Sequence, residues 1–225
     1  MDHLVVNERG DITDINEKKS LFEKVYSVFF SYLFHPLFLI AWVTIYLLYR
    51  NDKIFLGLKS AERMIVFLRI FGTSIFIPLV TVLLLKALGF IQTIQLKTQK
   101  ERIIPYVACI TFFFWSFYVS KQLNDPPEFT AFLLSLFISS IAALLINNYF
   151  KVSMHAIGAG GLTAFFILLL FADKLNDMIS FVAAIVIAGI ICSSRLVSGN
   201  HSPFEIYFGF IAGFILQLIA WAIIV

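Results

Sequence analysis

The chain has 225 residues, of which 60% are hydrophobic and only 14% charged, and its mean hydropathy is +0.91. Soluble domains are about half apolar and a quarter charged, so this composition excludes a typical soluble enzyme, a disordered chain and a coiled coil. A net charge of +3 from 17 basic and 14 acidic residues provides no basic surface for nucleic acid. We therefore expect an all-α, polytopic membrane helical bundle.

The first 27 residues are polar and precede the first apolar segment. Acidic residues occur throughout residues 1–20, where a cleavable signal peptide needs a basic start and an apolar stretch. We expect residues 1–27 to form a polar N-terminal tail. Residues 28–225 are expected to form a single membrane-embedded helical domain.

Seven later segments approach the length of about 20 apolar residues that a membrane-spanning helix needs. They are residues 28–49, 64–90, 103–120, 129–149, 155–172, 176–192 and 204–225. His35-Pro36 interrupts the first segment and predicts a kink there, although His35 could instead line a polar cavity. In the last segment, Gly209 and Gly213 have a small-xxx-small spacing that predicts close helix packing. The sequence thus predicts six to seven transmembrane helices.

Ionisable residues gather in three of the connections between these segments. The three regions are residues 97–105, 151–155 and 194–205, which follow two, four and six apolar segments. If seven spans are correct, counting places all three regions on one membrane face. Polar groups at the edges of spans are costly, so their presence suggests a function.

The residues of these regions suit a pocket that binds phosphate and transfers it. Cations near helix starts attract anions, and arginine grips phosphate with two hydrogen bonds. His155 and His201 add a proton donor and a nucleophile near neutral pH. Glu205 lies four residues after His201, close enough to orient its imidazole and stabilise the imidazolium. The sequence has no carboxylate cluster for magnesium, so we expect a metal-free phosphohistidine mechanism without a cofactor.

The three regions resemble the signatures of the type 2 phosphatidic acid phosphatases, lipid phosphatases related to vanadium haloperoxidases. Residues 194–205, SRLVSGNHSPFE, keep the spacing of the third signature (Ser-Arg, five residues, His, three residues, Asp), with Glu205 in place of Asp. Residues 151–155, KVSMH, are similar to the second signature, Pro-Ser-Gly-His. Residues 97–105, KTQKERIIP, match the first signature (Lys, six residues, Arg-Pro) more loosely.

The resemblance implies a phosphatidic acid phosphatase/haloperoxidase-like core and a role for each matched residue. His201 would attack phosphorus, His155 would protonate the leaving alcohol, and Glu205 would orient His201. The residues that would bind the phosphoryl oxygens are Lys97, Arg102, Ser153 and Arg195. The implied substrate is a lipid phosphate monoester or pyrophosphate, and the implied surroundings are the bilayer.

The distribution of charge does not determine on which side of the membrane the site lies. Counts of Lys and Arg are nearly balanced between the two faces once the expected phosphate ligands are set aside. Similar enzymes place this site on the extracytoplasmic face. We expect a multi-pass protein of the bacterial inner membrane with a site that faces outward.

Each of these residues also has a structural interpretation. Residues 202–205, SPFE, form a good capping box for the last helix. His155 alone is typical of a helix start, and Arg195 alone is typical of a snorkelling side chain. The first alternative function is a non-catalytic protein that binds a phospholipid headgroup or assists a transporter. The second is a small transporter or channel, which needs ionisable residues near the bilayer midplane, where these segments have almost none.

Overall fold

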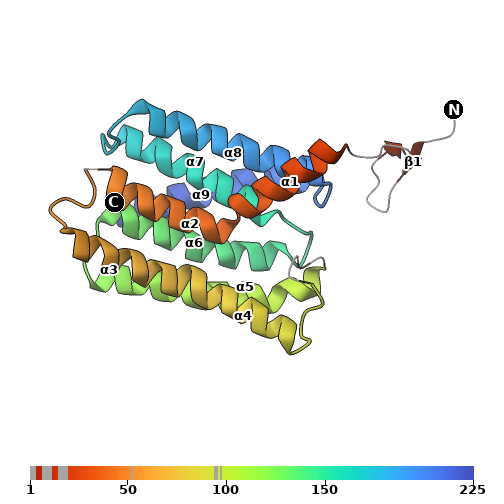
Figure 1. Cartoon of the computed structure of the whole chain (residues 1–225), viewed down its shortest axis with the longest axis horizontal. Helices are drawn as coiled ribbons and strands as arrows, with labels where there is room; N and C mark the ends of the chain where they lie inside the picture. Colours follow the sequence, from red (N-terminus) through yellow and green to blue (C-terminus); the bar gives the residue numbers. More distant parts are fainter. Residues whose placement is uncertain (1–3, 7–11, 15–19, 52, 94–95, 97) are drawn as a thin grey trace.

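The computed structural model describes residues 4–6, 12–14, 20–51, 53–93, 96 and 98–225. Near the N-terminus, β1 (Leu4–Val6) and β2 (Ile12–Asp14) form an antiparallel hairpin that lies apart from the helices (Figure 1). This hairpin lies in the predicted polar tail and was not expected. Every other regular element is helical, so the all-α prediction is confirmed for the described part of the bundle.

The helices follow one another with short connections. The first group is α1 (Leu21–Leu33), α2 (Pro36–Ile45), the π-helical turn η1 (Tyr46–Arg50), α3 (Ser60–Phe71), the π-helical turn η2 (Gly72–Phe76) and α4 (Ile77–Ala87). The second group is α5 (Gln99–Gln122), α6 (Pro127–Ile146), α7 (Met154–Phe171), α8 (Met178–Ser198) and α9 (Pro203–Ile224).

Six helices among the described residues are long and apolar enough to cross a membrane, with α3, η2 and α4 counted as one helix. The bent pair of Val25–Leu33 and Pro36–Arg50 raises this number to seven if it forms one span. The chain is therefore a multi-pass integral membrane protein with six to seven spans, as predicted.

The predicted kink in the first span is confirmed. The two helices of the bent pair meet at an angle of 55°, and Pro36 is the first residue of α2. Proline has no N–H to donate and clashes with a preceding helical turn, so the chain begins a new helix here. Across the bend, Trp42 Nε1 donates to the Leu33 carbonyl oxygen at 3.3 Å.

The helices α7 and α9 pack with their backbones in direct contact, which confirms the packing predicted for the last segment. A Cβ atom added to Gly160 would lie 1.9 Å from the Phe210 carbonyl oxygen. One added to Gly213 would lie 2.0 Å from the Ile157 carbonyl oxygen. Only glycine allows this approach, so the crossing fixes α7 and α9 relative to each other.

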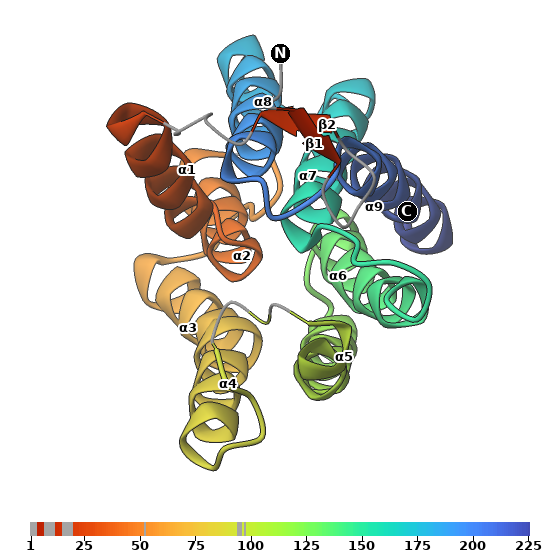
Figure 2. The same cartoon turned by 90° about the vertical axis from the view of Figure 1, so that its right-hand side faces the viewer.

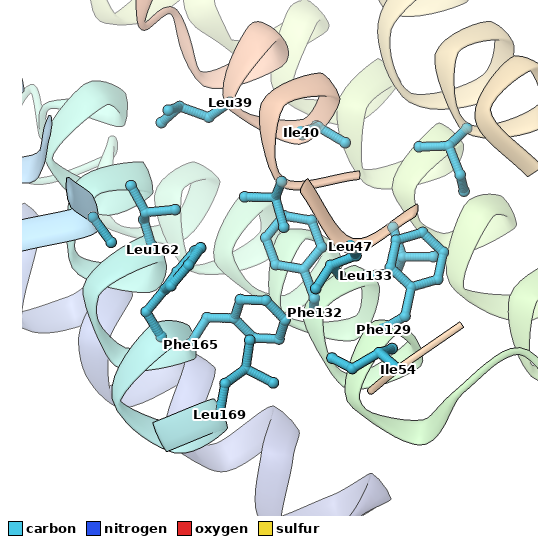
Figure 3. Packing of buried hydrophobic residues seen from close by; sticks show 14 of the residues in the cluster. Leu39, Ile40, Leu47, Ile54, Phe129, Phe132, Leu133, Leu162, Phe165 and Leu169 are labelled. Atoms are coloured by element: carbon cyan, nitrogen blue, oxygen red, sulfur yellow. The ribbon is translucent and has the colours of Figure 1, made fainter. Parts of the chain in front are cut away.

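Aromatic and aliphatic side chains fill the space between α2, α6 and α7 (Figure 3). Phe129, Phe165 and Leu47 are completely buried there, and the rings of Phe132 and Phe165 lie 5.1 Å apart. Figure 2 shows that α7 lies inside the bundle, next to α2, α6, α8 and α9. A residue at the start of α7 is thus held by a packed core on several sides.

Candidate functional site

The three regions that resemble phosphatase signatures meet at one end of the bundle, the end on the right in Figure 1. The backbone N–H of Ser153 donates to the Glu205 carbonyl oxygen at 3.4 Å. Arg102 Nη1 donates to the Val152 carbonyl oxygen at 3.0 Å, which ties α5 to the same place. We call this end, defined by the described residues 98–105, 151–155 and 194–205, the motif end. Figure 2 looks at the bundle from the motif end.

His201 lies in the turn between α8 and α9. Gly199 ends α8 with a positive φ of 70°, a conformation that glycine adopts without strain, and the chain then reverses toward α9. The Nδ1 atom of His201 lies 2.9 Å from Glu205 Oε2 and 3.0 Å from the Lys151 carbonyl oxygen. Both oxygens can only accept, so Nδ1 carries the proton. The Nε2 atom of neutral His201 therefore keeps its lone pair.

Glu205 makes both of the contacts that the sequence suggested for it. The capping box of α9 is confirmed, since Ser202 N–H donates to Glu205 Oε2 at 3.1 Å and Glu205 N–H donates to Ser202 Oγ at 3.3 Å. The same Oε2 atom accepts from His201 Nδ1. One carboxylate oxygen thus holds the start of a helix and the orientation of an imidazole.

His155 lies in the first turn of α7 and contacts the first span. Its Nε2 atom is 3.0 Å from the Ser31 carbonyl oxygen, so Nε2 carries the proton in the neutral ring. The ring of His35 lies edge-on to the ring of His155, with centroids 5.2 Å apart and planes at 88°. The break between α1 and α2 therefore brings a serine and a third histidine to the motif end.

Two arginines add positive charge beside the histidines. Arg195, in the last turn of α8, donates from Nη1 to Ser31 Oγ at 3.0 Å, and its buried Nε has no hydrogen-bond partner among the described residues. Arg102 donates from Nε to the Leu96 carbonyl oxygen at 2.9 Å. No ion pair among the described residues joins either arginine to a carboxylate. An anion would supply the missing negative charge.

Burial, together with the positive charges around it, keeps His201 neutral. Its side chain is only 3% exposed. Burial, and then the positive charges of Arg195, Arg102 and Lys151, lower its pKa to about 3, although the hydrogen bond to the Lys151 carbonyl opposes this change. With its pKa this low, the imidazole carries one proton, on Nδ1, and Nε2 is unprotonated at neutral pH.

Of the two remaining predicted phosphate ligands, Ser153 and Lys97, the structure describes only Ser153. Ser153 is completely buried and caps α7, because its Oγ accepts from the Ala156 N–H at 3.4 Å. Lys97 lies outside the described residues. The predicted residues that the structure does bring together are His155, His201, Glu205, Arg102, Ser153 and Arg195.

Sequence reasoning missed one member of this cluster and left another undecided. Ser31 is a serine within an apolar segment and carries no signal of its own. His35 was interpreted mainly as part of a kink, with a polar cavity as the alternative. An ionisable residue within an apolar span was the signal that could have placed it at the site.

Comparisons with known proteins give no match for this chain. No family model, no curated protein and no solved structure matches it. Among the described residues, no group of three or more His, Cys, Asp or Glu side chains is arranged to hold a metal ion. The chemistry of the motif end must therefore be argued from its own geometry.

Proposed function

We propose that this protein is an integral membrane lipid phosphatase of the type 2 phosphatidic acid phosphatase kind, which hydrolyses a lipid phosphate monoester or pyrophosphate. The observation that carries the proposal is the protonation of the two histidines in a cationic site. His201 holds its proton on Nδ1 against Glu205, which leaves Nε2 as a nucleophile. His155 donates its Nε2 proton to the Ser31 carbonyl oxygen, which leaves Nδ1 as the ring nitrogen that can take up and return a proton.

The first half-reaction forms a phosphohistidine. A lipid phosphate monoanion brings one proton, which His155 takes up next to the bound phosphate. Nε2 of His201 attacks phosphorus, and the bond from phosphorus to the alkoxide oxygen breaks. His155 gives its extra proton to that oxygen, so the neutral lipid alcohol leaves. Glu205 stabilises the positive charge that develops on the imidazole of His201.

The second half-reaction restores the enzyme. Water attacks the phosphorus of the phosphohistidine, and His155 takes one proton from this water. The bond between phosphorus and His201 Nε2 breaks, and His155 passes the proton it took from water to the phosphate, which leaves as the monoanion. Both histidines are then neutral again. The guanidinium groups of Arg195 and Arg102 stabilise the negative charge on the phosphoryl oxygens in both transition states.

The position of the site favours a lipid substrate. The motif end lies where α5, α7 and α9 begin, at one end of helices long enough to span a bilayer. A phosphate headgroup can enter this end while its acyl or isoprenyl chain stays among lipids. Phosphatidic acid, phosphatidylglycerol phosphate and polyprenyl pyrophosphate all fit this description.

Phosphate release from a panel of these lipids tests the proposal. The wild type, purified in detergent and assayed without added metal, is expected to release phosphate from at least one of them. His201→Ala should reduce the rate to background, and His155→Ala should reduce it by a factor on the order of 10²–10⁴. Lys174→Ala, at the other end of the bundle, is the control and should leave the rate unchanged. Background release from all four proteins would contradict the proposal.

A second candidate is a non-catalytic protein that binds a phospholipid headgroup. The observation that favours it is the engagement of both His155 and Arg195 by Ser31. If this contact persists with a ligand bound, the headgroup binds beside the histidine without reacting. Binding of lipid phosphate that Arg195→Gln weakens, together with background phosphate release, is the outcome expected for this candidate.

A further inference from the structure

The break in the first span places an imidazole where a simple kink does not need one. His35 is the N-cap of α2, and its Nδ1 accepts from the Leu37 N–H at 3.3 Å. This cap needs only an acceptor, and Asn, Asp and Ser are the residues that proteins prefer there. An ionisable ring within an apolar span is costly. The cap therefore does not account for the histidine.

What the ring faces gives a better explanation. Because Nδ1 of His35 accepts a hydrogen bond, its proton is on Nε2. The ring lies edge-on against His155, at 5.2 Å between centroids. The guanidinium group of Arg195 lies near both rings. The hydrogen bond from His155 Nε2 goes to the Ser31 carbonyl oxygen. His155 thus contacts both Ser31 and His35, which come from the two sides of the break in the first span.

We propose that His35 is a positioning residue for His155, and that the break between α1 and α2 exists to deliver it. The inference rests on the proposed phosphatase function and adds a third imidazole to that site. The edge of the His35 ring fixes the plane of the His155 ring. His155 can then direct its proton at the leaving oxygen while His201 attacks from its own side.

This role predicts a defect that depends on the leaving group. Without the His35 ring, the hydrogen bond to the Ser31 carbonyl oxygen remains but does not by itself fix the plane of the His155 ring, so proton delivery to the leaving oxygen becomes inefficient. Attack by His201 is unaffected, because Glu205 and the Lys151 carbonyl orient it independently. An alkyl phosphate needs the proton, whereas 4-nitrophenolate is a stable anion that leaves without one. The loss should therefore appear on the first substrate and not on the second.

His35→Asn is the sharpest variant, because asparagine keeps an N-cap acceptor for Leu37 and removes only the ring. We expect it to lower kcat on hexadecyl phosphate by about 10–10²-fold and kcat on 4-nitrophenyl phosphate by less than about threefold. His155→Ala should give the same pattern with a larger loss. Trp42→Phe is the matched control: it removes a hydrogen bond across the same bend without touching His155, and both rates should stay near wild type.

Each other outcome overturns the inference. Wild-type rates for His35→Asn on both substrates would mean that His35 serves only as a cap. Equal losses on both substrates would mean that the ring supports the fold and not the proton transfer. If the wild type releases no phosphate from any substrate, the proposed function fails and this inference fails with it. An active wild type with an unimpaired His35→Asn variant rejects this inference alone.

Discussion

The two ends of the bundle differ in how their charges are paired. At the end opposite the motif end, four cations are paired with carboxylates from other segments, while Arg63 donates to the Leu48 and Leu58 carbonyl oxygens. The ion pairs there are Arg50–Asp177, Lys53–Asp173, Arg69–Asp125 and Lys174–Glu128. They connect η1 and the loop after it with the loop before α8, and they connect α3 and α6 to neighbouring loops. Among them, the pairs with a buried carboxylate, Arg69–Asp125 and Lys174–Glu128, would be costly to break, whereas the exposed pairs contribute little.

The motif end has cations whose charge is not matched in this way. Arg102 and Arg195 donate to neutral oxygens, from carbonyl groups and from the Ser31 hydroxyl. The one carboxylate that contacts the site, Glu205, is used by His201 and by the cap of α9. The difference lies in the carboxylate partners: ion pairs hold four cations at the opposite end, whereas Arg102 and Arg195 have no such partner among the described residues. An anion from outside would supply that partner at the motif end.

The largest expected effect is a loss of turnover on removal of Glu205, the carboxylate of the motif end. Glu205→Ala removes the acceptor that orients His201 and is expected to lower turnover by a factor on the order of 10²–10⁴. Glu128→Ala is the matched change at the opposite end and should leave turnover per folded molecule unchanged. Steady-state phosphate release from a lipid phosphate measures both. An unchanged rate for Glu205→Ala would leave this residue with its capping role alone.

At the opposite end, loss of an ion pair is expected to lower stability and leave activity unchanged. Arg69 and Asp125 form an ion pair whose side chains are only 16% and 9% exposed. Arg69→Gln leaves the Asp125 charge buried without its partner, which costs about 3–5 kcal/mol. Thermal or denaturant unfolding in detergent should show this loss, whereas kcat per folded molecule should stay near wild type. A stable but inactive Arg69→Gln variant would contradict the assignment of this pair to structure.

Arg195→Gln should weaken function more than folding. The change removes a guanidinium group that has no carboxylate partner, so little pairing is lost in the empty protein. A charge-assisted hydrogen bond to phosphate contributes about 1.5–3 kcal/mol, so kcat/KM should fall by about 10–10²-fold. Comparing kcat/KM with the unfolding midpoint separates the two effects. A large loss of stability with normal kcat/KM would place Arg195 among the structural charges.

The smallest effect is a shift in pH dependence. The charge of Arg195 helps to lower the pKa of His201 to about 3, so its removal should raise that pKa toward the ordinary value of 6.5. Protonation of His201 removes the nucleophile, so the acid limb of the kcat/KM profile should move to higher pH in Arg195→Gln. Lys174→Gln, at the opposite end, should leave the limb in place. A limb that moves to lower pH would contradict the electrostatic account.

Sequence patterns predicted the spans because the apolar length that a bilayer requires is a local property. The ends of the spans were less accurate where capping extends a helix. Residues 103–120 were expected as one span, but α5 begins at Gln99, because Thr98 and Glu101 form a capping box. The predicted capping box at the start of α9 is confirmed. Its carboxylate, Glu205, also contacts His201, because the same Oε2 atom accepts from both the Ser202 N–H and His201 Nδ1.

The sequence could not predict the contacts of Ser31 and His35 with His155, because these contacts depend on the direction of the bend between α1 and α2. Proline predicts a break near His35, but the angle of 55° and the face presented by the break depend on how α1 packs against α8. The contacts of Ser31 and His35 with His155 follow from that packing. Neither residue matches a signature, so only the folded arrangement reveals them as neighbours of the site.

Binding of orthovanadate to the purified protein tests the central claim that the motif end is built for a tetrahedral oxyanion. Vanadate adopts the trigonal-bipyramidal geometry of a transferring phosphoryl group, so a site for that transition state should bind it tightly. Titration calorimetry should give one site per chain in the wild type, at least tenfold weaker binding in Arg195→Gln, and unchanged binding in Lys174→Gln. Absence of binding, or binding that Arg195→Gln leaves unchanged, would contradict the claim.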